Sequence, residues 1–196
     1  SIKRIDNMSF RSDRNAQQFD LFINFLPPTS EPHTYALPAL YPYATQVNGE
    51  IGGQFEISYM IPRGTPLGGK YGTRLNFNSA VSNSIDKSVL EDGTRGLKGT
   101  QGYISDYLKL GPIRYFQDLN ASISHKFSKK YKSQITFYHL EYNKTVLNDG
   151  VGDITILENP GMDSVININA MVWENQFKIP NGQTIRSELQ FALADG

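Results

Sequence analysis

Alternation of apolar and polar residues with a period of two is the feature that most limits the folds open to this chain. Its clearest example is residues 118–127, where Leu119, Ile123 and Phe127 share one face while Asp118 and Ser122 share the other. Successive side chains of a β-strand point to opposite sides, so this segment has one apolar and one polar face. The same pattern predicts an all-β chain with seven strands, at residues 18–25, 51–61, 70–78, 118–127, 133–143, 163–178 and 185–193.

Two of these segments do not keep a single phase. In 133–143, Ile135 lies on one face but Tyr138 and Leu140 lie on the other, and in 163–178 the apolar phase set by Ile168 gives way to Trp173. A β-bulge that flips the phase would explain this pattern, and so would a strand that is buried on both faces.

The connections between the strands alternate between long and short. The long ones are residues 27–48, 80–116 and 144–162, and the short ones are residues 62–69, 128–132 and 180–183. Long structureless loops are uncommon in compact soluble domains, whereas outer-membrane barrels carry long outer loops and short periplasmic turns. The rhythm predicts one domain over residues 1–196, an antiparallel up-and-down transmembrane β-barrel or a contiguous seven- to eight-strand segment of a larger one.

Composition narrows the function classes. The 19 Lys and Arg residues balance the 19 Asp and Glu residues, so no net basic charge points to nucleic acid as a partner. The chain has no Cys, which excludes disulfides, thiolate metal sites and a Cys nucleophile. The chain has 39% hydrophobic residues and a mean hydropathy of −0.41. No stretch of it approaches the apolar length that a membrane helix needs. A barrel wall, by contrast, hides its apolar half in alternation.

A soluble β-sandwich or a lipocalin-like barrel would alternate in the same way, with the apolar face turned inward. Three observations favour the membrane barrel. The strands are long enough to cross a bilayer at a tilt, their polar faces carry full charges in mid-strand, and aromatic residues such as Tyr59, Tyr131 and Trp173 gather near strand ends.

Six charged residues on the polar faces are predicted to point into a wet lumen: Glu56, Arg74, Asp118, Lys126, Arg186 and Glu188. The opposite faces, which hold Ile57, Leu75, Ile123 and Leu189, are then expected to contact outer-membrane lipid. The short turn at 62–69 is also expected to bring Glu56 and Arg74 close together on the inner face.

Motifs for catalysis, cofactors or metals are weak in this sequence. The run from Gly64 to Lys70 fits a phosphate-binding loop until Tyr71, which stands where the motif needs Ser or Thr, and a strand pattern follows where a helix should begin. A glycine-rich hairpin turn explains the run. The acidic residues between Asn148 and Asp163 fit no calcium motif and read as a solvated loop. We therefore predict no catalytic residue, no metal, no cofactor and no enzyme activity.

The loop at 27–48 is the most distinctive surface segment. Five prolines stiffen it, and it carries the candidate binding residues His33, Tyr35, Tyr41 and Tyr43. Rigid aromatic rings lose little entropy on contact, so such a loop could bind sugars or protein partners. The alternative is a loop that folds over the barrel mouth and packs on itself.

Four segments carry a resemblance to a known family: RIDNMSFRSDR at 4–14, HTYALPALYPYATQVNGEIGGQ at 33–54, GTPLGGKYGTRLNFN at 64–78 and YFQDLNASISHKF at 115–127. The chain resembles uncharacterised outer-membrane β-barrel proteins from Bacteroidota. The resemblance implies a bacterial outer-membrane location and offers no catalytic residue to transfer.

The members of that family resemble larger barrels with a secretion signal, and bacterial barrels close with an even number of strands. This chain begins without an apolar signal segment and shows seven predicted strands, with only thin support for an eighth in residues 1–16. We expect a segment of a longer barrel that acts as a pore, or as a scaffold subunit that meets other envelope proteins. The rival hypothesis is a soluble β-sandwich that binds carbohydrate or protein through its long aromatic loops.

Overall fold

The computed structural model describes residues 1–6, 27–30, 32–46, 49–89, 103–148 and 165–196. Its elements are β1 (Ile2–Ile5), α1 (Ala36–Ala39), β2 (Glu50–Ile61), β3 (Thr73–Ile85), β4 (Ser88–Val89), β5 (Tyr103–Ile104), β6 (Leu110–Lys126), β7 (Tyr131–Asn143), α2 (Lys144–Asn148), β8 (Val165–Lys178), the 3-10 turn η2 (Pro180–Gly182) and β9 (Thr184–Asp195). Within these ranges no helix has the length and apolar character needed to cross a membrane.

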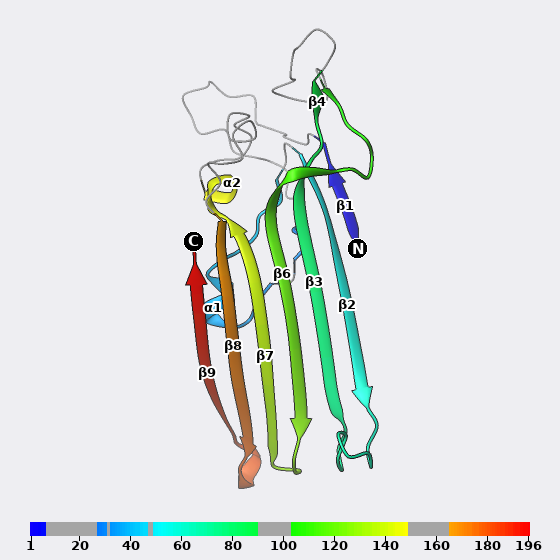
Figure 1. The fold of residues 1–196 in the computed structure, drawn as a ribbon. Coiled ribbons are helices and arrows are strands. Elements are labelled where there is room, and N and C mark those ends of the chain that lie inside the picture. Colours follow the sequence, from blue (N-terminus) through cyan, green and yellow to red (C-terminus); the bar gives the residue numbers. More distant parts are fainter. Residues whose placement is uncertain (7–26, 31, 47–48, 90–102, 149–164) are drawn as a thin grey trace.

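Seven of the strands form one antiparallel sheet in the order β1-β2-β3-β6-β7-β8-β9, and β4 and β5 form a separate pair (Figure 1). The all-β, up-and-down prediction is confirmed. In the described part of the chain β1 and β9 are the two edges and do not pair with each other, so the sheet is not closed into a barrel.

Six of the seven predicted strands appear as β2, β3, β6, β7, β8 and β9. The seventh, at 18–25, lies outside the described residues. The remaining strand of the sheet is β1, which pairs with the first residues of β2, from Ile2 opposite Gly53 to Ile5 opposite Glu50.

The connections between neighbouring long strands do alternate as expected. The short ones all lie at one end of the sheet and the long ones at the other (Figure 1). The predicted loop at 80–116 is too long, because β3 continues to Ile85 and β6 already begins at Leu110. The prediction at 27–48 also differs, since described residues of this segment run along one face of the sheet and not beyond its end (Figure 1).

The loop at 80–116 is predicted too long because apolar and polar residues stop alternating at the ends of β3 and β6 that border it. The pairing of β3 with β6 shifts register between Ser82 and Asn83 and again between Asn83 and Ile85. On β6 the buried phase changes at Tyr115 and Phe116, which are both buried although they are neighbours. A bulge of this kind removes the period-two signal from the sequence.

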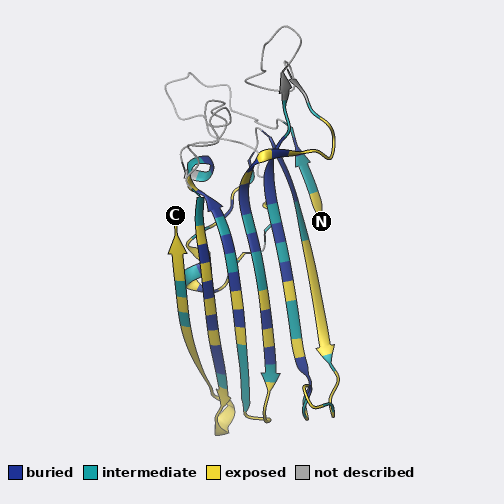
Figure 2. Cartoon of the chain, viewed as in Figure 1, coloured by how far each residue is buried: buried dark blue, intermediate teal, exposed yellow. Residues whose placement is uncertain are grey.

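The two irregular strands, in contrast, contain no bulge. β7 keeps one continuous register with β6 and with β8. Tyr138 and Leu140 are buried on one side of the sheet while Ile135 and Phe137 are exposed on the other, which gives the bands of Figure 2. Neither explanation offered by the sequence holds, because these strands carry apolar residues on both faces and only one of the two faces is buried.

The predicted proximity of Glu56 and Arg74 is wrong. Their side chains share a face, but Glu56 lies opposite Asn78 and Arg74 lies opposite Met60. The connection runs from Pro62 to Gly72, longer than predicted, so the two residues are four positions apart along the strands, or about 13 Å. The turn is extended because Gly72, at φ 86°, prolongs it past Gly69 before β3 begins.

The short connections follow a stepped line across the sheet. One continuous row of paired residues runs from Ile61 through Thr73, His125 and Asn175 to Ser187. The β2–β3 connection leaves directly from this row. The last pair of β6 and β7, Lys126 with Lys132, lies one residue beyond it, and the last pair of β8 and β9, Lys178 with Thr184, lies three residues beyond it.

Candidate functional site

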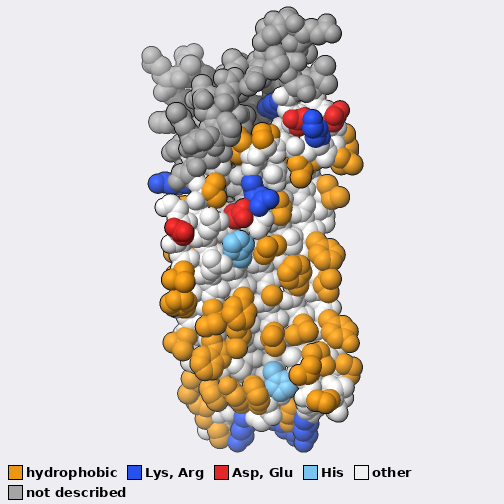
Figure 3. Space-filling view, viewed as in Figure 1, with side chains coloured by type: hydrophobic (Ala, Val, Ile, Leu, Met, Phe, Trp, Pro, Cys, Tyr) orange, Lys and Arg blue, Asp and Glu red, His pale blue; other side chains and the backbone are white. Residues whose placement is uncertain are grey.

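One face of the sheet is apolar and exposed over its whole width. Register aligns its residues in rows across the strands, for example the row Tyr59, Leu75, Ile123, Ile135, Trp173 and Leu189. Ile123 is 51% exposed and Leu189 is 64% exposed. We call this surface the apolar face, and Figure 3 shows its hydrophobic side chains spread over the strands. The sequence places Ile57, Leu75, Ile123 and Leu189 on this face, and none of them lies in a closed core.

Aromatic rings border the apolar face at the end with the short connections. Phe127 stacks on Tyr131 with ring centroids 5.2 Å apart, and Tyr131 stacks on Phe177 at 4.6 Å. His125 meets Phe127 edge to face at 4.5 Å. Since Tyr131 also donates a hydrogen bond to Asn175 Oδ1 at 2.8 Å, the border combines apolar rings with polar contacts.

Polar side chains border the apolar face toward the long connections. His139 Nδ1 and Asn169 Oδ1 are hydrogen-bonded at 2.9 Å, and Arg114 forms an ion pair with Glu141 at 2.8 Å. Between the two borders, Leu119 to Phe127 spans eight residues of β6, or ~26 Å along the strand.

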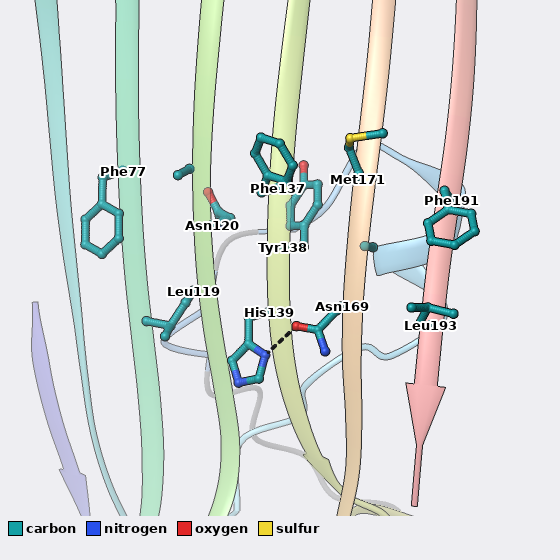
Figure 4. A pocket seen from close by; sticks show the side chains of 12 residues that line it. Phe77, Leu119, Asn120, Phe137, Tyr138, His139, Asn169, Met171, Phe191 and Leu193 are labelled. Carbon is teal, nitrogen blue, oxygen red and sulfur yellow. Dashed lines mark hydrogen bonds between the residues drawn. The ribbon is translucent and has the colours of Figure 1, made fainter.

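The centre of the apolar face holds an open depression of about 360 Å³. Phe77, Phe137, Met171 and Phe191 surround it from four strands (Figure 4), and Ala121 is also among the residues that line it. Most of its lining is apolar, and the polar residues among those that line it are Asn120, Tyr138, His139 and Asn169.

The opposite face is polar, and the described residues of the segment 27–46, which are 27–30 and 32–46, lie across it. We call this segment the strap. In Figure 1 it passes behind the sheet, with α1 near β8 and β9. Three carboxylates on three different strands, Glu50 on β2, Asp118 on β6 and Glu174 on β8, attach the strap to the sheet.

Glu50 is fully buried and accepts hydrogen bonds from Tyr43 and from the backbone N–H of Gln46 in the strap. The Tyr43 hydroxyl donates to Glu50 Oε2 in a short hydrogen bond, and the Gln46 amide donates to the same oxygen at 2.7 Å. Lys3 Nζ lies 2.8 Å from Glu50 Oε1 and so neutralises the carboxylate. Tyr43 also stacks on Phe116, in the largest cluster of buried apolar residues.

Asp118 is also fully buried. Its Oδ2 lies 3.0 Å from His33 Nε2, and its Oδ1 accepts from Asn120 at 3.1 Å. The His33 ring meets Tyr138 edge to face at 5.0 Å.

Glu174 connects the strap with the edge strand β9. It accepts from Tyr35 at 3.0 Å and from Gln176 at 2.7 Å, and Arg186 pairs with it at 2.8 Å. The Leu37 amide donates to Gln190 Oε1 at 2.9 Å, which fixes α1 against β9.

The phenol groups of Tyr35 and Tyr43 stay protonated in these surroundings. Burial, followed by the charge of Glu50, raises the pKa of Tyr43 far above its usual value. Burial and the hydrogen bond to Glu174 raise the pKa of Tyr35. A protonated phenol can donate to a carboxylate, so both residues act as hydrogen-bond donors over the whole neutral range.

The six charged residues predicted for the lumen share the polar face, because they occupy the same phase of the continuous register. Asp118 is buried beneath the strap, and Glu56, Arg74, Lys126, Arg186 and Glu188 are exposed. That this face lines a lumen stays a prediction.

Sequence reasoning missed two of the three carboxylates that hold the strap. Glu174 lies on the same face of the sheet as Arg186 and Glu188, but the aromatic residues Trp173 and Phe177 made the two faces of its strand hard to tell apart in the sequence. Glu50 was missed because it precedes the alternating run of its strand. The phase of β8 alone could have placed Glu174 beside the other charges.

The candidate binding residues of the 27–48 loop turn toward the sheet. Tyr35 and Tyr43 are buried, and Tyr41 contacts Tyr142 edge to face at 5.6 Å. The loop packs on the polar face, and not on itself at the mouth. A ligand for His33, Tyr35, Tyr41 and Tyr43 stays a prediction.

The run from Gly64 to Lys70 is a hairpin turn, in which Gly64 N–H donates to Gly69 C=O at 2.7 Å. The acidic loop lies largely in 149–164, outside the described residues.

Comparison with known proteins places the chain by sequence alone. The profile of the family of unknown function DUF6029 matches residues 1–196, which is the whole chain. No curated protein and no solved structure matches it. The bacterial group and the membrane suggested by the resemblance stay predictions, whereas the family is shown. The chain therefore belongs to the family of unknown function DUF6029.

Proposed function

We propose that this chain forms part of the wall of a β-barrel in a bacterial outer membrane, with the apolar face against lipid and the polar face toward the interior. The observation that carries the proposal is the inverted distribution of side chains. The exposed face is apolar, and the face covered by the strap holds buried carboxylates and serines beside apolar residues such as Leu140, Ile168 and Val172. A sheet of a water-soluble protein buries its apolar face.

The extent of the apolar face supports lipid as its solvent. Apolar patches on soluble monomers rarely exceed a few hundred Å². Here large side chains are exposed on every strand from β2 to β9 in the main sheet, including Phe55, Phe77, Phe137 and Phe191. The ~26 Å between its borders fits the apolar band of a barrel, about 25 Å tall, and the stacked aromatic border fits an interfacial girdle.

The strap favours a scaffold over an open pore. It covers the polar face of β6, β7 and β8, so in a closed barrel it would occupy part of the interior. Its attachment through Glu50, Asp118 and Glu174 spans most of the sheet's width. The proposal includes further strands beside β9, since unpaired backbone groups in lipid are costly.

The single Trp of the chain gives a direct test. Trp173 lies on the apolar face and is 40% exposed. The protein would be reconstituted into phosphatidylcholine vesicles, and its Trp fluorescence compared with and without bromine on the lipid acyl chains. We expect strong quenching by the brominated lipid.

The control moves the fluorophore to the polar face in the double variant Trp173→Phe, Ser58→Trp. Ser58 is exposed and lies on the polar face of β2, on the same side as Glu56. Its Trp should escape acyl-chain quenching and respond to aqueous iodide. Unquenched Trp173, or equal quenching at both sites, would refute a lipid-facing apolar face.

A further inference from the structure

We infer that the end of the sheet with the short connections binds anionic phospholipid headgroups. Seven basic residues gather there, and we call them the basic rim: Arg63, Lys70, Lys126, Lys129, Lys130, Lys132 and Lys178. Figure 3 shows Lys and Arg side chains at this end of the molecule. This inference rests on the proposed function, because it needs the apolar face to lie in lipid.

The basic rim has no acidic partner in its own connections. Residues 61–72, 126–132 and 178–184 contain no Asp or Glu, and all of them are described. Among the described residues none of the seven cations belongs to an ion pair. Several other basic residues differ, since Arg4, Arg114 and Arg186 each pair with a carboxylate. The rim is therefore charged without internal neutralisation.

The register of β6 with β7 places two of these charges side by side. Lys126 lies directly opposite Lys132, and both belong to the polar face, because Lys126 shares the phase of Asp118 and Ser122 on β6. Like charges at such positions repel each other, so these two lysines raise the positive potential of the rim from the interior side. The backbone N–H of Lys178 donates to the Lys130 carbonyl at 2.8 Å. This bond fixes the β6–β7 connection, which contains Lys129 and Lys130, next to the end of β8.

The aromatic border gives the depth at which the anion is bound. The stacked rings of Phe127, Tyr131 and Phe177 come from the same strand ends as the rim. Lys126 Nζ lies 5.1 Å from the centroid of the Tyr71 ring. Aromatic rings of this kind sit at headgroup level, with lysine side chains extending just beyond them into the phosphate layer. A phosphate there would be contacted by lysines while its acyl chains run along the apolar face.

A lipid-selectivity measurement tests the inference. The protein would be placed in equal mixtures of phosphatidylglycerol and phosphatidylcholine, with the bromine carried by one lipid or by the other. We expect Trp173 to be quenched more by brominated phosphatidylglycerol, with a preference of roughly fivefold per engaged lysine that falls as NaCl is added. The double variant Lys129→Gln, Lys130→Gln, which changes the two exposed lysines of the β6–β7 connection, should reduce this preference.

The matched control is Lys109→Gln, Lys144→Gln, which removes two charges from the opposite end and should keep the preference. Equal quenching by both brominated lipids in the unmodified protein would overturn the inference and leave the proposed function standing. Quenching by neither would refute the proposed function instead. If inorganic phosphate at constant ionic strength abolished the preference, the rim would be a free-phosphate site and the lipid assignment would be wrong. The salt titration of the unmodified protein decides the case if the double variant fails to fold.

Discussion

At the scale of single residues, the buried carboxylates decide how firmly the strap holds. A buried carboxylate is tolerated when it is neutralised and its oxygens accept hydrogen bonds. Glu50 meets both conditions through Lys3, Tyr43 and the Gln46 amide. Removal of one donor leaves the charge in place with fewer partners, which costs more than the net value of one hydrogen bond.

The substitution Tyr43→Phe is expected to lower the free energy of unfolding by about 1–3 kcal/mol, because Glu50 stays buried with one donor fewer. Denaturant titration of the reconstituted protein measures this change. Tyr41→Phe is the control, since the Tyr41 ring contacts Tyr142 while its hydroxyl makes no hydrogen bond with the described residues. Equal losses in both variants would mean that ring packing alone, and not the Glu50 contact, holds the strap.

At the scale of elements, the bulge between β3 and β6 depends on a glycine. A Cβ atom at Gly111 would lie 2.2 Å from Ser84 Oγ and 2.6 Å from the carbonyl oxygen of Ile85. The second contact is with backbone, so rotation of a side chain cannot relieve it. Gly111 lies next to Leu110, the residue that pairs with Ile85 beyond the register shifts.

Gly111→Ala is therefore expected to destabilise the protein by about 1–3 kcal/mol, through forced backbone shifts in β3 and β6. Gly53→Ala is the matched control, because its nearest contact would be the Ser1 carbonyl at an ordinary 3.5 Å. Thermal unfolding in detergent compares the two variants. A Gly111→Ala protein as stable as Gly53→Ala would show that the close approach at the bulge is not required.

The same elements show how far sequence reasoning reaches. Strands with one polar and one apolar face, such as the part of β6 that follows Phe116, were found because alternation is a local signal. The ends of β3 and β6 were missed since a bulge erases that signal. β7 and β8 were ambiguous because the strap also buries apolar residues on the polar face, Tyr138 and Leu140 on β7 and Ile168 and Val172 on β8. The strap's attachment was beyond reach, since the distance between Tyr43 and Glu50 or between His33 and Asp118 depends on tertiary folding and not on spacing.

At the scale of the whole molecule, the two faces should respond oppositely to charge. Ile123→Arg would place a guanidinium in the middle row of the apolar face, at a cost of about 2–4 kcal/mol if that row lies at the bilayer midplane. Ser122, its neighbour, is a poor control, because it is buried and accepts a hydrogen bond from Asn76 at 3.1 Å. Ser58→Arg serves better, since Ser58 is exposed on the polar face at nearly the same level.

Unfolding of each variant in lipid vesicles measures the contrast. Ser58→Arg should cost little, since its side chain meets water or the neighbouring Asn76. A larger loss for Ser58→Arg than for Ile123→Arg would mean that the apolar face is not the one in lipid.

The stepped line of the short connections fixes how the strands cross a membrane. From the β2–β3 connection to the β8–β9 connection the strand ends advance by three residues, or about 10 Å, over four strand spacings, or about 19 Å. If a flat surface holds these three connections at one height, the strands must lean from its normal by roughly 25–30°. Any strand added beside β9 with the same step between neighbouring strand ends would continue this displacement along the strand direction. A ring closed from such strands would then meet its first strand displaced along the axis, which is the shear that a closed barrel requires.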